Sequence, residues 1–112
     1  MIAIPKKLLI HSASLHKKIL DKWEGNKLDE GISLQFIRIE PSSKIVHDKQ
    51  NAEIQLAATL FYDSKNSRPK EVMFIEDDII LFDGLYFSVQ VIEPLYDGQR
   101  LHHTELGLIR YA

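Results

Sequence analysis

The sequence predicts a mainly β chain: a small antiparallel β-barrel or sandwich of about five or six strands with two long polar loops. Two Asp-Gly pairs, Asp83-Gly84 and Asp97-Gly98, lie between runs rich in β-branched and aromatic residues. Asp-Gly favours a tight hairpin turn because Gly accepts a positive φ. Residues 86–92 alternate between apolar and polar side chains, which is the period of a strand with one buried face. The last third of the chain is therefore predicted to form three consecutive antiparallel strands.

Size and composition indicate one ordinary globular domain over residues 1–112. The chain is 45% hydrophobic and 27% charged, and its net charge of −2 gives no bulk attraction to nucleic acid or to an anionic membrane. The lack of cysteine excludes disulfides and thiolate metal sites, and it fits a reducing compartment. Residues 1–7 are too few for the hydrophobic region of a signal peptide, because charged residues follow at once. No apolar run approaches the ~18–20 residues of a membrane span.

The N-terminal half is predicted to contain two strands. Residues 8–16 are most simply a first strand, although apolar residues at three- and four-residue spacing over 15–23 would also suit a short helix. Residues 32–40 form a second strand in which the apolar face switches between Phe36 and Ile37. Such a switch predicts a β-bulge or a strand that crosses between layers.

The middle of the chain alternates polar and apolar stretches. Residues 42–51 are polar and predict a long loop or a flexible hairpin arm, and residues 52–62 predict a third strand. Residues 63–71 predict a second exposed loop, which is the one noticeably basic loop of the sequence. The apolar residues 72–75 then lead through the acidic residues 76–78 into the C-terminal strands.

The sequence His102-His103-Thr-Glu105 raises the question of a metal site. Neighbouring residues of a strand face opposite sides, so His102 and His103 are not expected to point at one ion, whereas His103 and Glu105 share a face. A third ligand would have to be His11, His16 or His47. Nothing in the sequence brings one of these close, so a structural or interface histidine pair is the favoured interpretation over a metal-dependent hydrolase.

No catalytic motif is present. The acidic residues 76–78 are expected to form a solvated turn without a partner base, and Asp83 is expected to be a turn former. There is no Gly-x-Ser-x-Gly, P-loop or dinucleotide-binding pattern, so enzyme activity is not predicted. A different hypothesis is an OB-like barrel that binds single-stranded nucleic acid through aromatic side chains, although the negative net charge argues against it. The aromatic residues concerned are Phe36, Phe61, Tyr62, Phe74, Phe82, Tyr86 and Phe87.

Five stretches of the sequence carry a family resemblance that covers nearly the whole chain. They are Ile4-Pro-Lys-Lys-Leu-Leu-Ile-His-Ser12, Arg38-Ile-Glu-Pro-Ser-Ser-Lys44, Ala58-Thr-Leu-Phe-Tyr-Asp-Ser-Lys-Asn-Ser67, Ile80-Leu-Phe-Asp-Gly84 and Val91-Ile-Glu-Pro-Leu-Tyr-Asp-Gly-Gln-Arg-Leu-His-His-Thr-Glu-Leu-Gly-Leu108. They resemble the small minor capsid proteins of tailed phages and prophages of Gram-positive bacteria. Within that group the chain looks like a head-closure (stopper) protein of the head–tail connector. The most specific part is Glu93-Pro-Leu-Tyr-Asp-Gly98 followed by Leu101-His-His-Thr-Glu-Leu-Gly-Leu108.

The resemblance implies a small β-barrel that assembles into a homo-oligomeric ring beneath the portal and adaptor. The ring would pass DNA through its lumen, receive a tail-completion protein below, and use no cofactor and no membrane. It implies a structural protein of the virion, assembled in the host cytoplasm. The polar loops would then order against neighbours, and Arg68 and Lys70 would meet DNA phosphates or an acidic partner. The candidate interface residues are Lys44, His47, Lys49, Lys65, Arg68, Lys70, Tyr96, Asp97, His102, His103 and Glu105.

Overall fold

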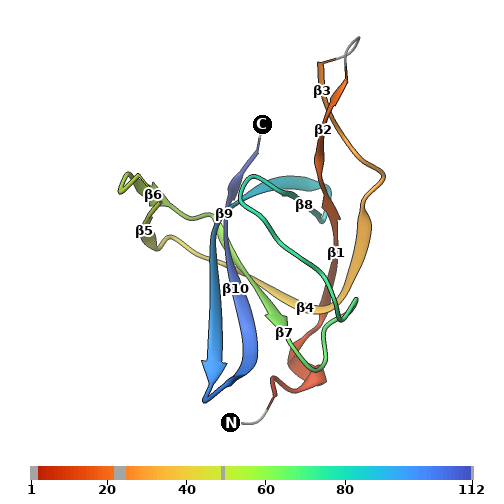
Figure 1. The fold of residues 1–112 in the computed structure, drawn as a ribbon, viewed down its shortest axis with the longest axis vertical. Coiled ribbons are helices and arrows are strands. Elements are labelled where there is room, and N and C mark those ends of the chain that lie inside the picture. Colours follow the sequence, from red (N-terminus) through yellow and green to blue (C-terminus); the bar gives the residue numbers. More distant parts are fainter. Residues whose placement is uncertain (1–2, 22–24, 49, 112) are drawn as a thin grey trace.

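Strands dominate the computed structural model, which describes residues 3–21, 25–48 and 50–111 (Figure 1). The elements in this part of the chain are η1 (Lys6–Leu8), β1 (His11–His16), β2 (Lys18–Asp21), β3 (Gly25–Leu28), β4 (Ile32–Pro41), β5 (Ile45–His47), β6 (Glu53–Gln55), β7 (Ala58–Asp63), β8 (Ile79–Phe82), β9 (Leu85–Asp97) and β10 (Arg100–Arg110). None of the described helices is long and apolar enough to cross a membrane. The predicted mainly β class is confirmed.

Six strands form a closed barrel in the order β1-β4-β7-β10-β9-β8, and every pairing in it is antiparallel. The barrel closes because β1 pairs with β8, with Ser14 opposite Leu81 and His16 opposite Ile79. Closure leaves no strand of this sheet with an unpaired edge, which protects the chain from uncontrolled edge-to-edge association. Of the two predicted arrangements, the barrel is the one observed.

Apolar side chains from all six strands fill the barrel. The core cluster contains Leu15, Leu34, Ile37, Ile39, Ala58, Leu60, Tyr62, Ile80, Phe87, Val89, Leu106 and Leu108. Several of these side chains are completely inaccessible to solvent, including Leu60 and Leu106 on neighbouring strands. Fully burying one such side chain contributes about 1.5–3 kcal/mol to stability.

The predicted change of face in the second strand is a β-bulge at Phe36. His11 lies opposite Ile37 and Ser12 lies opposite Gln35, so Phe36 has no partner residue on β1. Its φ of 56° turns the side chain outward, while Ile37 points into the core. One extra residue therefore lets both halves of β4 (Ile32–Pro41) contribute to the interior.

The predicted C-terminal meander is also confirmed. Asp83 and Gly84 both have positive φ, 52° and 78°, as a type I′ turn between β8 and β9 requires. The second turn is placed one residue later than the Asp-Gly pair suggests, because Asp97 remains in β9 and Gly98 is the first loop residue, with φ 64°. Gly at the first loop position is typical of a type II′ turn.

Two small hairpins lie outside the barrel, β2 paired with β3 and β5 paired with β6 (Figure 1). The helix considered over residues 15–23 is contradicted, because residues 15–16 lie in β1 and residues 18–21 lie in β2; residues 22–24 lie outside the described part. Leu15 pairs with Ile32 on one side and Ile80 on the other, and these tertiary ladders override the local helical spacing. The β5–β6 hairpin confirms the arm alternative for residues 42–51.

Two further expectations require correction. The strand expected over residues 52–62 is split into β6 and β7, and it breaks at residues 56–57, where Leu56 is buried and its N–H donates to the Lys44 carbonyl at 2.9 Å. The exposed loop expected over residues 63–71 contains two fully buried residues, Asp63 at the end of β7 and Ser67 in the loop that follows. Both corrections arise because segments distant in sequence cover these positions.

Candidate functional site

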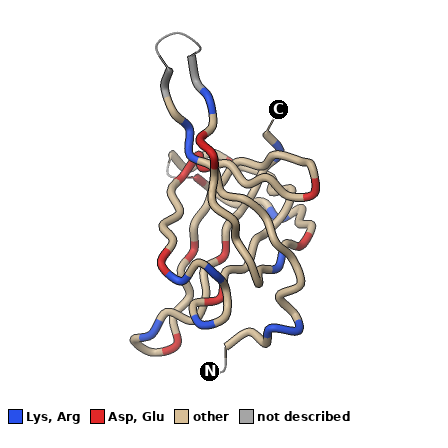
Figure 2. Tube along the Cα trace, turned by 90° about the vertical axis from the view of Figure 1, so that its right-hand side faces the viewer, with Lys and Arg blue, Asp and Glu red and all other residues tan. Residues whose placement is uncertain are grey.

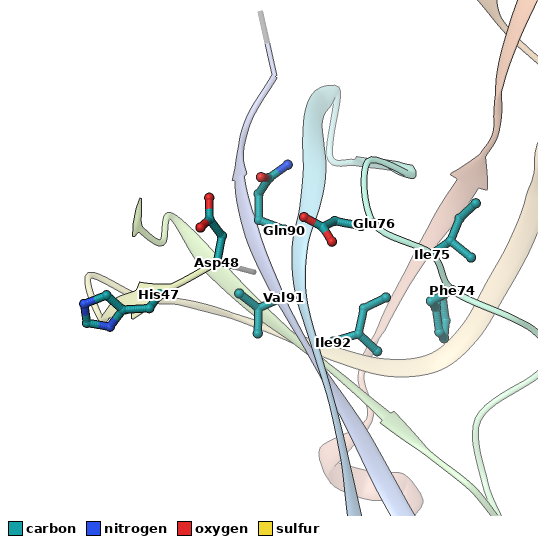
Figure 3. Close-up of a pocket in the computed structure, with 8 residues that line it drawn as sticks. All are labelled: His47, Asp48, Phe74, Ile75, Glu76, Gln90, Val91 and Ile92. Carbon is teal, nitrogen blue, oxygen red and sulfur yellow. The ribbon is translucent and has the colours of Figure 1, made fainter. Parts of the chain in front are cut away.

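A groove of about 380 Å³ lies between the β5–β6 hairpin, residues 74–76 and β9 (Figure 3). Its lining residues are His47, Asp48, Phe74, Ile75, Glu76, Gln90, Val91 and Ile92. We call it the arm groove. Figure 3 shows His47 and Asp48 on the hairpin side of the groove and Phe74 on the opposite side, in the segment that precedes β8. Val91 and Ile92 of β9 lie between the two sides.

The arm groove combines apolar and acidic character. Phe74 and Ile92 are partly buried and pack against the barrel core. By contrast, Ile75 is 52% exposed and the adjacent Met73 is 77% exposed. Apolar surface of this kind, bordered by the carboxylates of Asp48 and Glu76, is typical of a protein-binding site and offers no set of converging reactive groups.

A buried carboxylate holds the wall of the arm groove in place. Asp78 is 3% exposed, and it accepts hydrogen bonds from Lys17 Nζ at 2.6 Å and from the backbone N–H of Ile75 at 2.8 Å. Backbone hydrogen bonds from Asp77 to Val89 and from Val89 to Asp78, both 2.8 Å, join the segment to β9. The prediction of a solvated acidic turn is therefore wrong for Asp78, whose charge is neutralised by a lysine distant in sequence.

The loop after β7 is built around a second buried carboxylate. Asp63 accepts hydrogen bonds from the backbone N–H groups of Ile4 at 3.0 Å, Lys65 at 3.1 Å and Asn66 at 2.8 Å. Arg68 and Gln35 exchange backbone hydrogen bonds of 2.8 and 2.9 Å, which attach the loop to β4. The Asp-Ser-Lys-Asn sequence is a signal for such an Asx-type turn, and sequence analysis did not use it.

Tyr62 completes the attachment of this loop. Its hydroxyl donates a hydrogen bond to the carbonyl of Pro69, and its ring makes an edge contact with Phe74, with the centroids 5.1 Å apart. Burial raises the pKa of the Tyr62 hydroxyl to about 12, against a smaller lowering effect of the Arg68 guanidinium. The phenol is thus a neutral hydrogen-bond donor at ordinary pH.

The two adjacent histidines of β10 lie on the same side of the strand, contrary to expectation. Leu101 pairs with Tyr96 and His103 pairs with Leu95, so His102 is the extra residue of a β-bulge. The bulge brings the two Nδ1 atoms within 2.7 Å, and His103 Nε2 lies 2.9 Å from Glu105 Oε2. An ionised Glu105 carboxylate can only accept, so Nε2–H of His103 donates to it. In the neutral imidazole the other nitrogen, Nδ1, then accepts a hydrogen bond from Nδ1–H of His102. Among the described residues, no group of three or more potential ligands is arranged to hold a metal ion.

The predicted interface residues fall into separate regions. Lys44 and His47 belong to the β5–β6 hairpin and its approach, Lys49 lies outside the described residues, Lys65, Arg68 and Lys70 lie on the loop after β7, Tyr96 and Asp97 end β9, and His102, His103 and Glu105 lie on β10. A second hollow brings together Lys65, Asp97 and His102. Only His47 lines the arm groove, whose other residues were missed because they are scattered along the sequence.

The aromatic residues considered for nucleic-acid stacking do not share an exposed face. Tyr62 and Phe87 are buried, and Phe74 and Phe82 pack against the core. Phe36 and Tyr86 are exposed at 39% and 41%, and they occupy the β4 bulge and the start of β9. The aromatic side chains are mainly core residues, as the simpler interpretation of their strand positions predicts.

Comparison with known proteins gives one positive result. No curated protein and no solved structure matches the chain. The sequence model of a family described as minor capsid protein matches residues 5–108, which include both hairpins and the barrel strands except for the last two residues of β10. The chain therefore belongs to this family of phage minor capsid proteins, and its role is structural and associated with the virion.

Proposed function

We propose that this protein is a head-closure (stopper) component of the head–tail connector of a tailed phage or prophage. Copies of the chain assemble into a ring that joins the portal or adaptor to a tail-completion protein and lines or closes the DNA channel. The observation that supports this proposal best is the match of the minor capsid family to residues 5–108. The structure adds a barrel whose interior is filled by side chains and two hairpins that lie outside it.

The filled interior supports a structural role over ligand binding. Core side chains such as Leu34, Leu60 and Leu106 are completely buried, so the barrel has no room for a substrate among them. The arm groove, by contrast, is open and largely apolar. Association with another protein is the use that fits such a surface.

The hairpins outside the barrel support assembly. In β5 and β6 only the central residues, Val46 and Ile54, are partly buried, and the flanking residues are exposed. An isolated two-stranded hairpin is marginally stable in water, so contacts with a neighbour would stabilise it. A ring places neighbouring copies beside such hairpins.

Positive charge supports a contact with DNA or with an acidic partner. Figure 2 shows several Lys and Arg at the end of the molecule that carries the N terminus, and others at the opposite end. Lys6 and Lys7 of η1 and the loop residues Lys65 and Arg68 belong to segments joined at the N-terminal end by the hydrogen bonds between Ile4, Asp63 and Asn66. This local charge would interact with phosphates although the net charge of the chain is −2.

Deletion of the gene from the phage or prophage tests the proposal. We expect heads that package DNA but do not join tails, and we expect the protein expressed from a plasmid to restore tailed particles. Electron microscopy of restored particles should place the protein as a ring between the portal and the tail. Filled and tailed particles that form without the protein would contradict the proposal.

A further inference from the structure

We propose that a single contact, repeated head to tail, builds the ring: the arm groove of one copy receives the η1 segment of the next copy. This inference rests on the proposed function and names the surfaces through which copies associate. The partner is thus a second copy of this chain, recognised by apolar contact together with opposite charge.

The η1 surface consists of Lys6, Lys7, Leu8, Ile10 and Phe36. Its apolar side chains are strongly exposed for their type, at 45% for Leu8, 66% for Ile10 and 39% for Phe36. Ile10 and Phe36 line one shallow hollow, and Lys6 Nζ lies 4.6 Å from the centre of the Phe36 ring. Exposed apolar groups gathered around two lysines indicate a docking surface, whereas single exposed apolar residues do not.

The η1 surface is held in a fixed conformation. Backbone hydrogen bonds from Leu8 to Pro5 at 2.9 Å and from Leu9 to Lys6 at 3.0 Å form the helical turn. Arg38 Nη1 donates to the Leu8 carbonyl at 3.1 Å, and the side chain of Leu9 is buried. A preformed surface loses little conformational entropy when it binds, which favours association.

The two surfaces are complementary in chemistry. The η1 surface offers lysines and aliphatic side chains, and the arm groove offers the carboxylates of Asp48 and Glu76 around Phe74, Ile75, Val91 and Ile92. Opposite charges at the rim with apolar groups at the centre are the usual composition of a protein interface. The β2–β3 hairpin is a weaker match, since among its described side chains only Ile19 is a strongly exposed large apolar residue.

The positions of the surfaces require two different copies. In Figure 1 the η1 segment lies at the end of the barrel near the N terminus, whereas the β5–β6 hairpin projects from the opposite end and side. One chain cannot bring the two together while the barrel is intact. A contact between different surfaces of identical copies is heterologous, and it closes into a ring when the rotation per copy allows.

Cross-linking within particles tests the contact directly. The chain has no cysteine, so the variant Ile10→Cys/Ile75→Cys carries the sole thiols of the protein. In particles complemented with this variant, a short bismaleimide should yield a ladder of cross-linked oligomers. The single variants Ile10→Cys and Ile75→Cys are matched controls and should yield no ladder.

Charge reversal gives a second measurement. Lys7→Glu and Glu76→Lys should each reduce incorporation into particles about tenfold, and the double variant should restore most of it. Asp48 is left unchanged because its Oδ1 accepts hydrogen bonds from the backbone N–H groups of Gln50 and Ala52, both at 2.9 Å, and so supports the hairpin turn. The control is Glu30→Lys, which makes the same charge reversal as Glu76→Lys at an exposed residue between β3 and β4. This variant should incorporate normally.

The outcomes separate this inference from the function on which it rests. Normal incorporation of both charge variants, or dimers formed by a single-cysteine variant, would overturn the head-to-tail contact and leave the connector role intact. Absence of the wild-type protein from tailed particles would overturn the connector role itself. A ladder from the double-cysteine variant, together with rescue by the double charge variant, supports the inference.

Discussion

The barrel and the β5–β6 hairpin are both antiparallel strand pairs, yet they differ sharply in what their side chains bury. In β7 most residues are buried, and Leu60 is inaccessible to solvent. In β5 and β6 the outer residues of each strand are exposed. Hydrogen-bonded ladders are common to both, so the difference in stability comes from apolar burial. The comparison teaches that apolar burial stabilises the barrel, whereas the hairpin has little such burial and would be stabilised by the docking proposed above.

The strongest way to sharpen this comparison is to remove the same kind of side chain from each region. Leu106→Ala should lower the free energy of unfolding by about 2–5 kcal/mol, because it leaves a cavity in a close-packed interior. Ile45→Ala on β5, where the side chain is 58% exposed, should change it by less than about 0.5 kcal/mol. Urea denaturation of both variants measures the difference, and equal losses would contradict the division into barrel and hairpin.

The loop after β7 contains no strand. We nevertheless expect it to contribute to stability as the barrel does, because the buried carboxylate of Asp63 holds it in place. Asp63→Ala removes the acceptor of three backbone N–H groups and should cost about 3 kcal/mol. Lys65→Ala on the same loop removes an exposed side chain and keeps its backbone N–H, so it should be nearly neutral. Thermal unfolding of the two variants checks this prediction; similar melting temperatures would mean that water replaces Asp63.

The β8–β9 turn tests whether backbone conformation limits the barrel. Gly84 has φ 78° and no atom within 4 Å of an added Cβ, so a substitution there meets strain without a steric clash. Gly84→Val should cost about 1–3 kcal/mol because a β-branched residue disfavours positive φ. Gly84→Asn should cost less, since Asn tolerates this conformation. Denaturation midpoints that do not differ between the two variants would argue against the type I′ turn.

Tyr62 predicts a pH dependence for the barrel. Its pKa is raised from 10.0 to about 12, so the folded chain retains a proton that the unfolded chain loses in this range. The stabilisation by the neutral phenol is therefore complete below pH 10.0 and is lost as the pH rises to about 12. Tyr62→Phe loses the hydrogen bond to Pro69 and should be less stable by about 1 kcal/mol at neutral pH. This deficit should shrink on titration to alkaline pH, and a constant deficit would contradict the raised pKa.

The smallest expected effect is local opening of the hairpin without any change in global stability. Backbone amides of β5 and β6 should exchange with deuterium much faster than those of β7 and β10 in the isolated protein, because few side chains cover them. In assembled particles the hairpin amides should become protected. Hydrogen exchange with mass spectrometry measures both states, and slow exchange of the hairpin in isolation would remove the contrast with the barrel.

Local sequence signals predicted a large part of this fold. Alternation and the Asp83-Gly84 pair predicted the β8–β9–β10 meander. The switch after Phe36 predicted a bulge or a crossing between layers, and β4 has the bulge. These features depend on the side-chain period of a strand and on the φ preference of single residues. The sequence also showed the resemblance to minor capsid proteins, which the match to residues 5–108 confirmed.

The candidate sites were less accessible to sequence reasoning. The arm groove joins residues of β5, the segment before β8, and β9, which have no common motif. The two histidines of β10 were expected on opposite faces, but the bulge at His102 brought their rings together. Bulges of this kind depend on the register with the partner strand, which a single strand sequence does not reveal.

The sequence by itself determined that the chain is β-rich, where its tight turns lie, and which side chains are apolar enough to form a core. Only the tertiary structure decided that β1 pairs with β8 to close the barrel, that residues 15–21 extend as strands, and that Asp63 and Asp78 are buried. The physical reason is the distance along the sequence over which each effect acts, because turn and strand preferences depend on only a few neighbouring residues. Closure, burial and charge pairing such as that of Lys17 with Asp78 join residues about half the chain apart.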